Sequence, residues 1–308
     1  MAGFSDSYTA THLGFVGRIK EALLLYRTHA ADTQAKVAAH LRGMDDTRAS
    51  IEAALGEPLV GKTMLEIGPG QLLGQARYFA ADNTVVGIDL DEVLTSFNPI
   101  AMIRTLRVNG PVRFAKTLVR KLAGFDRQFL REMVRQRPSL KGSHPRVLRE
   151  DATNTSLPSA SFDCATSVSV FEHLPDPGGV LREIRRLLRP GGVSHHLIHL
   201  YTSDSGAHDA RTYLADRSGF PYWCHLRPAV QHLLAPNCYV NRLSLTDWTA
   251  LIEKECPGAQ VQQFRAQSPY PEELAKLRTA GELAEYSDAE LLTLVLMVIW
   301  KKPSEGPK

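Results

Sequence analysis

Two short apolar segments of this chain each end in residues suited to hold a ligand, and together they limit the possible folds more than any other feature. Met64–Ile67 is followed by Gly68-Pro69-Gly70, and Val85–Ile88 is followed by Asp89. Gly68 and Gly70 let the backbone approach a ligand closely, and a carboxylate on the second strand can accept hydrogen bonds from two neighbouring ribose hydroxyls. The pattern predicts two strands that bind an adenosine-containing molecule.

From residue 58 onwards, strand and helix patterns alternate, which predicts an α/β fold with a parallel sheet covered by helices on both faces. The first helix after the glycine turn is expected to start near Gln71, and another to span 178–188. The segments 260–266 and 292–301 are expected to add two strands at the end of the chain. The five earlier strands are expected at 63–67, 84–89, 146–148, 162–168 and 193–200.

Residues 1–57 are predicted to form an N-terminal helical cap, and residues 58–308 the main domain. Apolar residues recur at helical spacing in three groups within 13–56, and Asp45-Asp46-Thr47 offers a cap for the last of these helices. Because such helices cannot stand alone, we expect them to cover the edge or mouth of the sheet.

The segment between the second and third strands is too long for a simple connection. Asp89 and Asp151 are 62 residues apart, whereas roughly 20 to 25 residues suffice for a helix and two turns. Residues 104–149 hold thirteen Lys or Arg and two acidic residues, although the whole chain has a net charge of only +3. Apolar residues interleave with these cations at helical spacing, so we predict an amphipathic helical lid over 92–145.

Five motifs in order along residues 58–200 carry a family resemblance. They resemble class I S-adenosylmethionine-dependent methyltransferases, in the branch that acts on small molecules or glycans. The resemblance implies a Rossmann-like, seven-stranded sheet with an antiparallel terminal strand, and S-adenosyl-L-methionine as the cofactor. The motifs are Leu65-Glu-Ile-Gly-Pro-Gly70, Gly87-Ile-Asp-Leu-Asp91, Glu150-Asp-Ala152, Phe162-Asp-Cys-Ala-Thr-Ser-Val-Ser-Val-Phe-Glu-His-Leu174 and Leu188-Arg-Pro-Gly-Gly192.

The resemblance also implies which residues bind the cofactor. Glu66 and the turn from Gly68 to Gly70 would face its methionine part, and Asp89 would bind the ribose hydroxyls, with Leu90 beside it. The family often has a third glycine where this chain has Leu72, and we expect Gly74 to do part of its work. The remaining contacts are Asp151 and Ala152 at the adenine edge and the backbone of Val168 at the methionine amine.

A dinucleotide-binding dehydrogenase is the competing interpretation of the first two motifs. Its fingerprint would place a third glycine at Leu73, one residue before Gly74. The last two motifs have no role in that class. Outside the enzymes, the alternative is a subunit with the methyltransferase fold that binds the cofactor without turning it over, or a surface-bound scaffold.

Methyl transfer to a hydroxyl needs alignment of the acceptor and removal of its proton. We expect His173, His199 and His225 to be catalytic and weigh His208 as a further candidate; the carboxyl ends of strands face the ligand crevice, which favours His173 and His199. The segment 201–242, rich in aromatic residues, is expected to form the acceptor site. The expected reaction is O-methylation of a small-molecule or glycan hydroxyl, with N- or C-methylation of a natural product as the alternative.

We predict no metal site. Glu172-His173 is similar to the end of the Glu-x-x-Glu-His metal motif of ubiquinone-pathway and small-RNA methyltransferases, but Ser169 stands in place of the first Glu. The four cysteines show no paired spacing, and the N-terminus shows no secretory signal, so we expect a cytoplasmic protein. The cations of 104–149 suit contact with an anionic membrane surface or an exposed face of the lid; nucleic acid is not expected, and the oligomeric state is left open.

Overall fold

The computed structural model describes residues 32–95, 97–213, 217, 219–236 and 238–304. These residues form two compact units. We call residues 32–167, 178–195 and 299–304 the sheet unit, and residues 168–177 and 196–298 the loop unit. The helix expected from the apolar residues of 13–24 lies outside the described residues.

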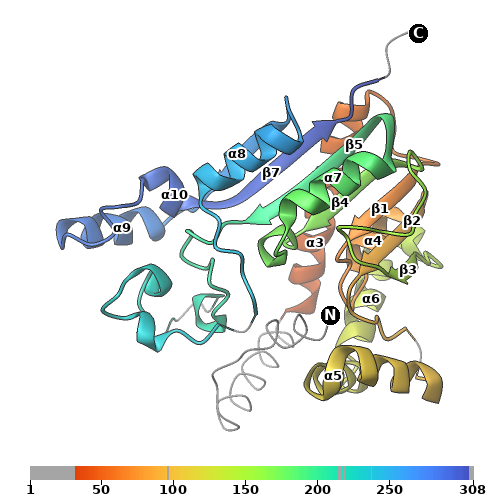
Figure 1. Cartoon of the computed structure of the whole chain (residues 1–308). Helices are drawn as coiled ribbons and strands as arrows, with labels where there is room; N and C mark the ends of the chain where they lie inside the picture. The colour runs from red at the N-terminus through yellow and green to blue at the C-terminus, as the bar shows by residue number, and fades with distance from the viewer. Residues whose placement is uncertain (1–31, 96, 214–216, 218, 237, 305–308) are drawn as a thin grey trace. The chain divides into compact units, whose positions relative to one another are not determined.

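Seven strands form one sheet in the order β3-β2-β1-β4-β5-β7-β6 (Figure 1). β1 pairs in parallel with both β2 and β4, and β2 pairs in parallel with β3. The strands are β1 (Thr63–Ile67), β2 (Thr84–Asp89), β3 (Arg146–Arg149), β4 (Phe162–Val168), β5 (Leu188–His199), β6 (Gln260–Arg265) and β7 (Thr293–Lys301).

β7 runs antiparallel to β5. The amide of Gly191 donates to the carbonyl of Lys302 at 2.9 Å, and the amide of Leu200 donates to the carbonyl of Leu294 at 2.9 Å. The start of β5 thus lies beside the end of β7, and the end of β5 beside the start of β7. The pairing at Gly191 also explains why β5 begins at Leu188 and not at the predicted residue 193. The strand order and this antiparallel strand confirm the predicted Rossmann-like α/β fold.

The register of β1 and β2 brings the two predicted ligand-binding ends to one edge of the sheet. Ile67 lies opposite Ile88, and the amide of Gly68 donates to the carbonyl of Ile88 at 2.9 Å. Four of the five residues of β1 are buried, as expected for a central parallel strand covered on both faces. The glycine turn and Asp89 therefore follow neighbouring strands at the same carboxyl edge.

Residues 33–55 form one helix, α3 (Thr33–Leu55), which Asp32 caps at its start and Gly56 ends in a left-handed conformation. The prediction that Asp45-Asp46-Thr47 starts a separate helix was wrong. The carboxylate of Asp45 accepts hydrogen bonds from the Arg137 guanidinium and the Tyr78 hydroxyl, each at 2.5 Å. Because these tertiary contacts use the carboxylate, it does not cap a helix start.

Two helices flank the strands of the sheet unit near their predicted positions. α7 (Pro177–Leu187) lies one residue from the predicted bounds. α4 (Gly74–Phe79) begins three residues later than expected, because Leu73 before it adopts a left-handed backbone with φ of 57°.

The basic insertion contains α5 (Pro99–Leu122), α6 (Phe125–Gln136) and the short turn η1 (Pro138–Leu140). α5 bends at Gly110, whose φ of 75° is not helical. The side chain of Asn109 fastens α5 to Glu92, accepting from its amide and donating to its carbonyl, both at 2.8 Å. The buried residues of α5 are polar, whereas the apolar residues Ile100, Ile103, Leu106, Val112, Val119 and Leu122 are exposed.

The loop unit has its own apolar core around Trp223, which is fully buried and whose indole donates to the carbonyl of Leu291 at 3.3 Å. Trp223 therefore packs within the loop unit. The helices of this unit are η2 (Phe171–His173), η3 (Ala210–Tyr213), η4 (Cys224–Leu226), η5 (Gln231–Leu233), α8 (Leu245–Glu255), α9 (Tyr270–Thr279) and α10 (Asp288–Leu292). Among the described residues, no helix has the length and apolar content that crossing a membrane requires.

Candidate functional site

The turn after β1 has the conformation that its glycines predict. Gly68 and Gly70 have φ values of 64° and 63°, in the left-handed region. A Cβ at Gly70 would meet no atom within 4 Å, so the backbone conformation and not crowding requires glycine there. At Gly87 on β2, a Cβ would lie 2.9 Å from the Pro69 side chain, and glycine at that position lets the turn pack against β2.

Glu66 places a buried carboxylate on β1 just before this turn. Its side chain is 5% exposed, and within the described part of the chain its Oε2 has no hydrogen-bond partner. Burial raises the pKa of Glu66 to about 8. A buried carboxylate without a partner is costly unless a ligand supplies a donor. The arrangement fits a ligand that brings an ammonium group to this edge of the sheet.

Asp89, at the end of β2, presents a second carboxylate. Its Oδ1 accepts a hydrogen bond from the amide of Asp91 at 2.9 Å. Burial raises the pKa of Asp89 to about 6, against opposing effects of the amides of Asp91 and Gly70 and the charge of Arg113. The next residue, Leu90, is 48% exposed. A carboxylate beside an exposed apolar side chain suits a ribose with an attached planar base.

The three other predicted cofactor positions lie in a turn and at a strand end. Asp151 is exposed, and its Oδ1 accepts from the amide of Thr153 at 2.9 Å and from its hydroxyl at 2.7 Å, which closes a turn. Ala152 follows in that turn, and Val168 ends β4 with 37% exposure. The adenine and amine contacts assigned to these residues stay predictions.

Gly74 has a packing role that the sequence did not indicate. A Cβ on Gly74 would lie 2.8 Å from Nε2 of His40 on α3. Glycine therefore leaves room for the His40 ring where α3 approaches the start of α4, which gives Gly74 a packing role without any ligand.

Three histidines lie together in the loop unit, and we call His173, His199 and His208 the histidine cluster. The ring centroids of His173 and His208 are 4.7 Å apart, and those of His199 and His208 are 4.9 Å apart. His173 follows β4 on η2, His199 ends β5, and His208 lies in the irregular segment after β5. The structure thus brings together His173 and His199, both predicted to be catalytic, and adds His208.

Hydrogen bonds orient two members of the histidine cluster. Nδ1 of His173 donates to the carbonyl oxygen of Tyr239 at 2.7 Å. Because the neutral ring then carries its proton on Nδ1, Nε2 keeps a lone pair. Nε2 of His199 lies 2.9 Å from the hydroxyl of Ser205 and 3.2 Å from that of Ser203.

The imidazoles of the cluster are held neutral. Burial lowers the pKa of His173. Burial lowers the pKa of His199 to about 4, with a smaller contribution from the nearby His173. Burial and both neighbouring imidazoles lower the pKa of His208 to about 3. All three are therefore proton acceptors or metal ligands at neutral pH, not cations.

His225 lies outside the histidine cluster. It is buried, its Nε2 donates to the carbonyl of Tyr201 at 2.7 Å, and burial lowers its pKa to about 4. Its assignment as a catalytic residue stays a prediction.

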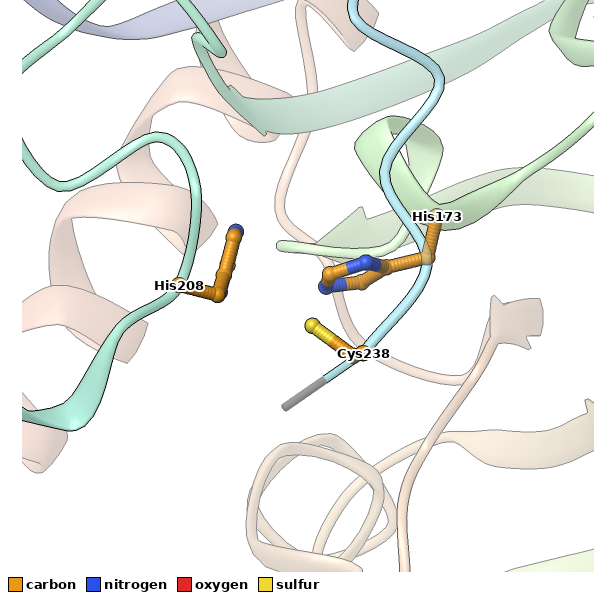
Figure 2. Close-up of side chains that lie close together, drawn as sticks. All are labelled: His173, His208 and Cys238. Carbon is orange, nitrogen blue, oxygen red and sulfur yellow. The ribbon is translucent and has the colours of Figure 1, made fainter. Parts of the chain in front are cut away.

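Two groups of potential metal ligands share His208. One is His173, His208 and Cys238, whose side chains point toward one another in Figure 2; the other is Glu172, His199 and His208. In each group the ligand atoms all lie within 4.8 Å of one another. The sequence analysis did not single out Cys238, since a lone cysteine 30 residues from the nearest ligand in sequence has no spacing that marks it.

Part of the chain matches a known protein family. Residues 108–195 match a family described as "Methyltransferase domain"; they include β3, β4, α7 and the first part of β5. No curated protein matches the chain.

Among solved structures, the chain is similar to phosphoethanolamine N-methyltransferase 2 of Haemonchus contortus in complex with S-adenosyl-L-methionine (17% identity, TM-score 0.44, 84% of this chain and 53% of that chain covered). It is also similar to the YcgJ protein of Bacillus subtilis (17%, 0.43, 83% and 100%) and to an S-adenosylmethionine-dependent methyltransferase of Mesorhizobium loti (17%, 0.42, 79% and 92%). The chain thus spans about half the length of the Haemonchus protein. At these identities and TM-scores, the likenesses identify no substrate.

Proposed function

We propose that this chain, a class I S-adenosylmethionine-dependent methyltransferase, transfers the methyl group to a hydroxyl of a small molecule or a glycan. The cofactor supplies an electrophilic methyl group on a sulfonium. The protein has to hold that group, align the acceptor with it and take up the proton of the hydroxyl. The supporting residues lie in the two units separately.

In the sheet unit, the buried carboxylate of Glu66, the half-buried carboxylate of Asp89 and a glycine turn fit the cofactor. Oε2 of Glu66, which has no partner among the described residues, would accept a hydrogen bond from the amine of the methionine part. Asp89 would accept hydrogen bonds from the ribose hydroxyls, and the exposed side chain of Leu90 would contact the adenine. The left-handed turn at Gly68 and Gly70 would let the backbone approach the ligand.

In the loop unit, the observation that carries the hydroxyl assignment is the orientation of His173. The Tyr239 carbonyl fixes the proton on Nδ1, and the lowered pKa keeps the ring neutral, so Nε2 is ready to accept a proton. A hydroxyl needs such a base, whereas a neutral amine can attack the methyl group without prior deprotonation. N- or C-methylation of a natural product remains the second possibility, and a non-catalytic binding subunit the third.

We also propose that α5 contacts an anionic membrane surface. Ile100, Val119 and Leu122 are 79%, 64% and 70% exposed. Nearby Arg107 and Lys116 form no ion pair with any residue that the structure describes. Exposed apolar side chains beside such cations are typical of helices that lie on anionic headgroups. We place the enzyme in the cytoplasm, where cysteines that form no disulfide are stable.

The test of the reaction is transfer of isotope-labelled methyl groups to a panel of acceptors. Phenolic, sugar and lipid-linked glycan hydroxyls are compared with primary amines and carbon nucleophiles of similar size, and mass spectrometry locates the label. We expect label on oxygen, lost in His173→Ala. Label on nitrogen or carbon would contradict the hydroxyl assignment. Titration calorimetry with S-adenosylmethionine tests the premise, and an absence of heat at millimolar cofactor would reject it.

A further inference from the structure

The loop unit brings imidazole and thiol groups together at one point, and we propose that His173, His208 and Cys238 bind a transition-metal ion, of which Zn²⁺ fits best. Their ligand atoms all lie within 4.8 Å of one another (Figure 2). In a tetrahedral zinc site, bonds of about 2.0 to 2.3 Å place neighbouring ligand atoms roughly 3.3 to 3.8 Å apart. Small side-chain rotations therefore suffice to close the site.

The surroundings of His173 are those of a metal-bound imidazole. Histidines that bind metals commonly donate the other ring N–H to a carbonyl or a carboxylate, which fixes the tautomer and the ring orientation. His173 does this through Nδ1 to the carbonyl of Tyr239 at 2.7 Å. Tyr239 directly follows Cys238 in sequence, so one short segment both supplies the thiol ligand and orients the imidazole.

His208 and Glu172 carry polar atoms that need a partner. Nε2 of His208 and both carboxylate oxygens of Glu172 are buried without a hydrogen bond to any described residue. The Glu172 carboxylate and His199 group with His208 within the same 4.8 Å limit. A cation bound by His208 would be next to this carboxylate, whose charge would balance that of the ion.

The donor set selects the kind of metal. Thiolate and imidazole ligands favour Zn²⁺ and related transition ions, whereas Mg²⁺ and Ca²⁺ take oxygen ligands. Three protein ligands leave a fourth position open, as in catalytic zinc sites. The catalytic role of the metal ion rests on the proposed function. In a hydroxyl methyltransferase such an ion would lower the pKa of the acceptor hydroxyl, and His173 would then act as a ligand of the ion and not itself as the proton acceptor.

The experiment measures the metal directly. The full chain is expressed without a histidine tag, and the metal that stays bound through gel filtration is quantified by mass spectrometry. The protein is also reloaded with Co²⁺. We expect about one equivalent of zinc, and with cobalt a thiolate-to-metal charge-transfer absorption that disappears in Cys238→Ser. In His208→Ala, zinc affinity should fall by about 100-fold or more, beyond the roughly 10- to 100-fold typical of a lost outer-shell partner.

Two matched substitutions serve as controls. His232→Ala removes an exposed imidazole on η5, and Cys256→Ser alters a buried thiol at the end of α8. Both should keep the metal and the cobalt absorption. Substoichiometric metal in the wild type, or a thiolate absorption that persists in Cys238→Ser, would overturn the assignment.

Cofactor affinity separates the two proposals. A ligand variant that binds S-adenosylmethionine as the wild type does has a folded sheet unit, so its metal loss is specific. Metal binding without cofactor binding would contradict the methyltransferase function and leave the metal site standing. Cofactor binding and turnover in metal-free protein would reject the metal site alone.

Discussion

Loss of contact with water makes both carboxylates of the candidate cofactor site weaker acids than usual, with Glu66 buried and Asp89 half-buried. Oε2 of Glu66 has no hydrogen-bond partner among the described residues, whereas Asp89 already accepts a hydrogen bond from the amide of Asp91. A ligand donor would therefore satisfy Glu66, and Asp89 has capacity left for a ligand hydroxyl. This division supports the proposed assignment of the amine to Glu66 and of the ribose to Asp89, which the family resemblance implies.

Asp89→Asn should weaken S-adenosylmethionine binding by about 10- to 100-fold, since a hydrogen bond to a charged acceptor contributes roughly 1.5 to 3 kcal/mol. Titration calorimetry measures the affinity. The control is Asp91→Asn, which removes a neighbouring carboxylate that forms an ion pair with Arg113 at 2.6 Å. Equal losses in the two variants would show that general charge, and not the position of Asp89, holds the cofactor.

Gly74→Ala should destabilise the protein by about 1 to 3 kcal/mol without changing cofactor affinity, because the added methyl would lie 2.8 Å from the His40 ring. The substitution His40→Ala opens space for it, so the double variant should recover part of the loss. Urea unfolding of the four proteins gives the coupling energy. A large drop in cofactor affinity for Gly74→Ala alone would show that Gly74 belongs to the cofactor-binding turn.

At the scale of elements, the strands were predictable because each is short, apolar and followed by a turn. β1, β2 and β4 have the predicted bounds. The helices were less predictable where distant residues override local signals. Asp45 looks like a helix cap in sequence, but its partner Arg137 lies 92 residues away. Similarly, β5 begins early because Gly191 pairs with Lys302 near the end of the chain.

The candidate site was predictable in part, for a related reason. His173 follows β4 and His199 is the last residue of β5, so the fold itself places them at the carboxyl edge. Cys238 and His208 come from an irregular segment with no periodic pattern. Their meeting with His173 depends on turns and on the Tyr239 contact, which no spacing in the sequence encodes.

The exposed face of α5 leads to a prediction about membranes. The full chain should co-sediment with vesicles that contain anionic lipid at low salt, and less with neutral vesicles or at high salt, because screening weakens the attraction. Arg107→Glu with Lys116→Glu should reduce binding strongly, and Ile100→Ser with Leu122→Ser should reduce it at both salt concentrations. Lys254→Glu, a charge reversal on the exposed side of α8, is the control. Binding that the α5 variants leave unchanged would contradict the proposal.

For the whole molecule, the chain divides its chemistry between two units that share strands. β4 and β5 begin in the sheet unit and end in the loop unit, and β7 returns from the loop unit to the sheet unit. The residues proposed to hold the cofactor, apart from Val168, belong to the sheet unit, and the histidine cluster belongs to the loop unit. The shared strands connect the proposed cofactor residues and the histidine cluster covalently. A change in the stability of the sheet should therefore affect both groups of residues.

Glu66→Gln should therefore make the cofactor-free protein more stable and a poorer binder. The folded-state pKa of Glu66, about 8, lies above its ordinary value of 4.5. Between these values the folded protein holds a proton that the unfolded chain has lost, so this residue makes stability fall as pH rises. Glutamine cannot ionise, and its advantage should grow from nothing below pH 4.5 to the order of a few kcal/mol above pH 8. Urea unfolding across this range measures the difference, with the exposed Glu253→Gln as control. A stability difference between variant and wild type that does not change with pH would contradict a neutral, buried Glu66. Unchanged cofactor affinity in Glu66→Gln would contradict the role of Glu66 as the partner of the amine.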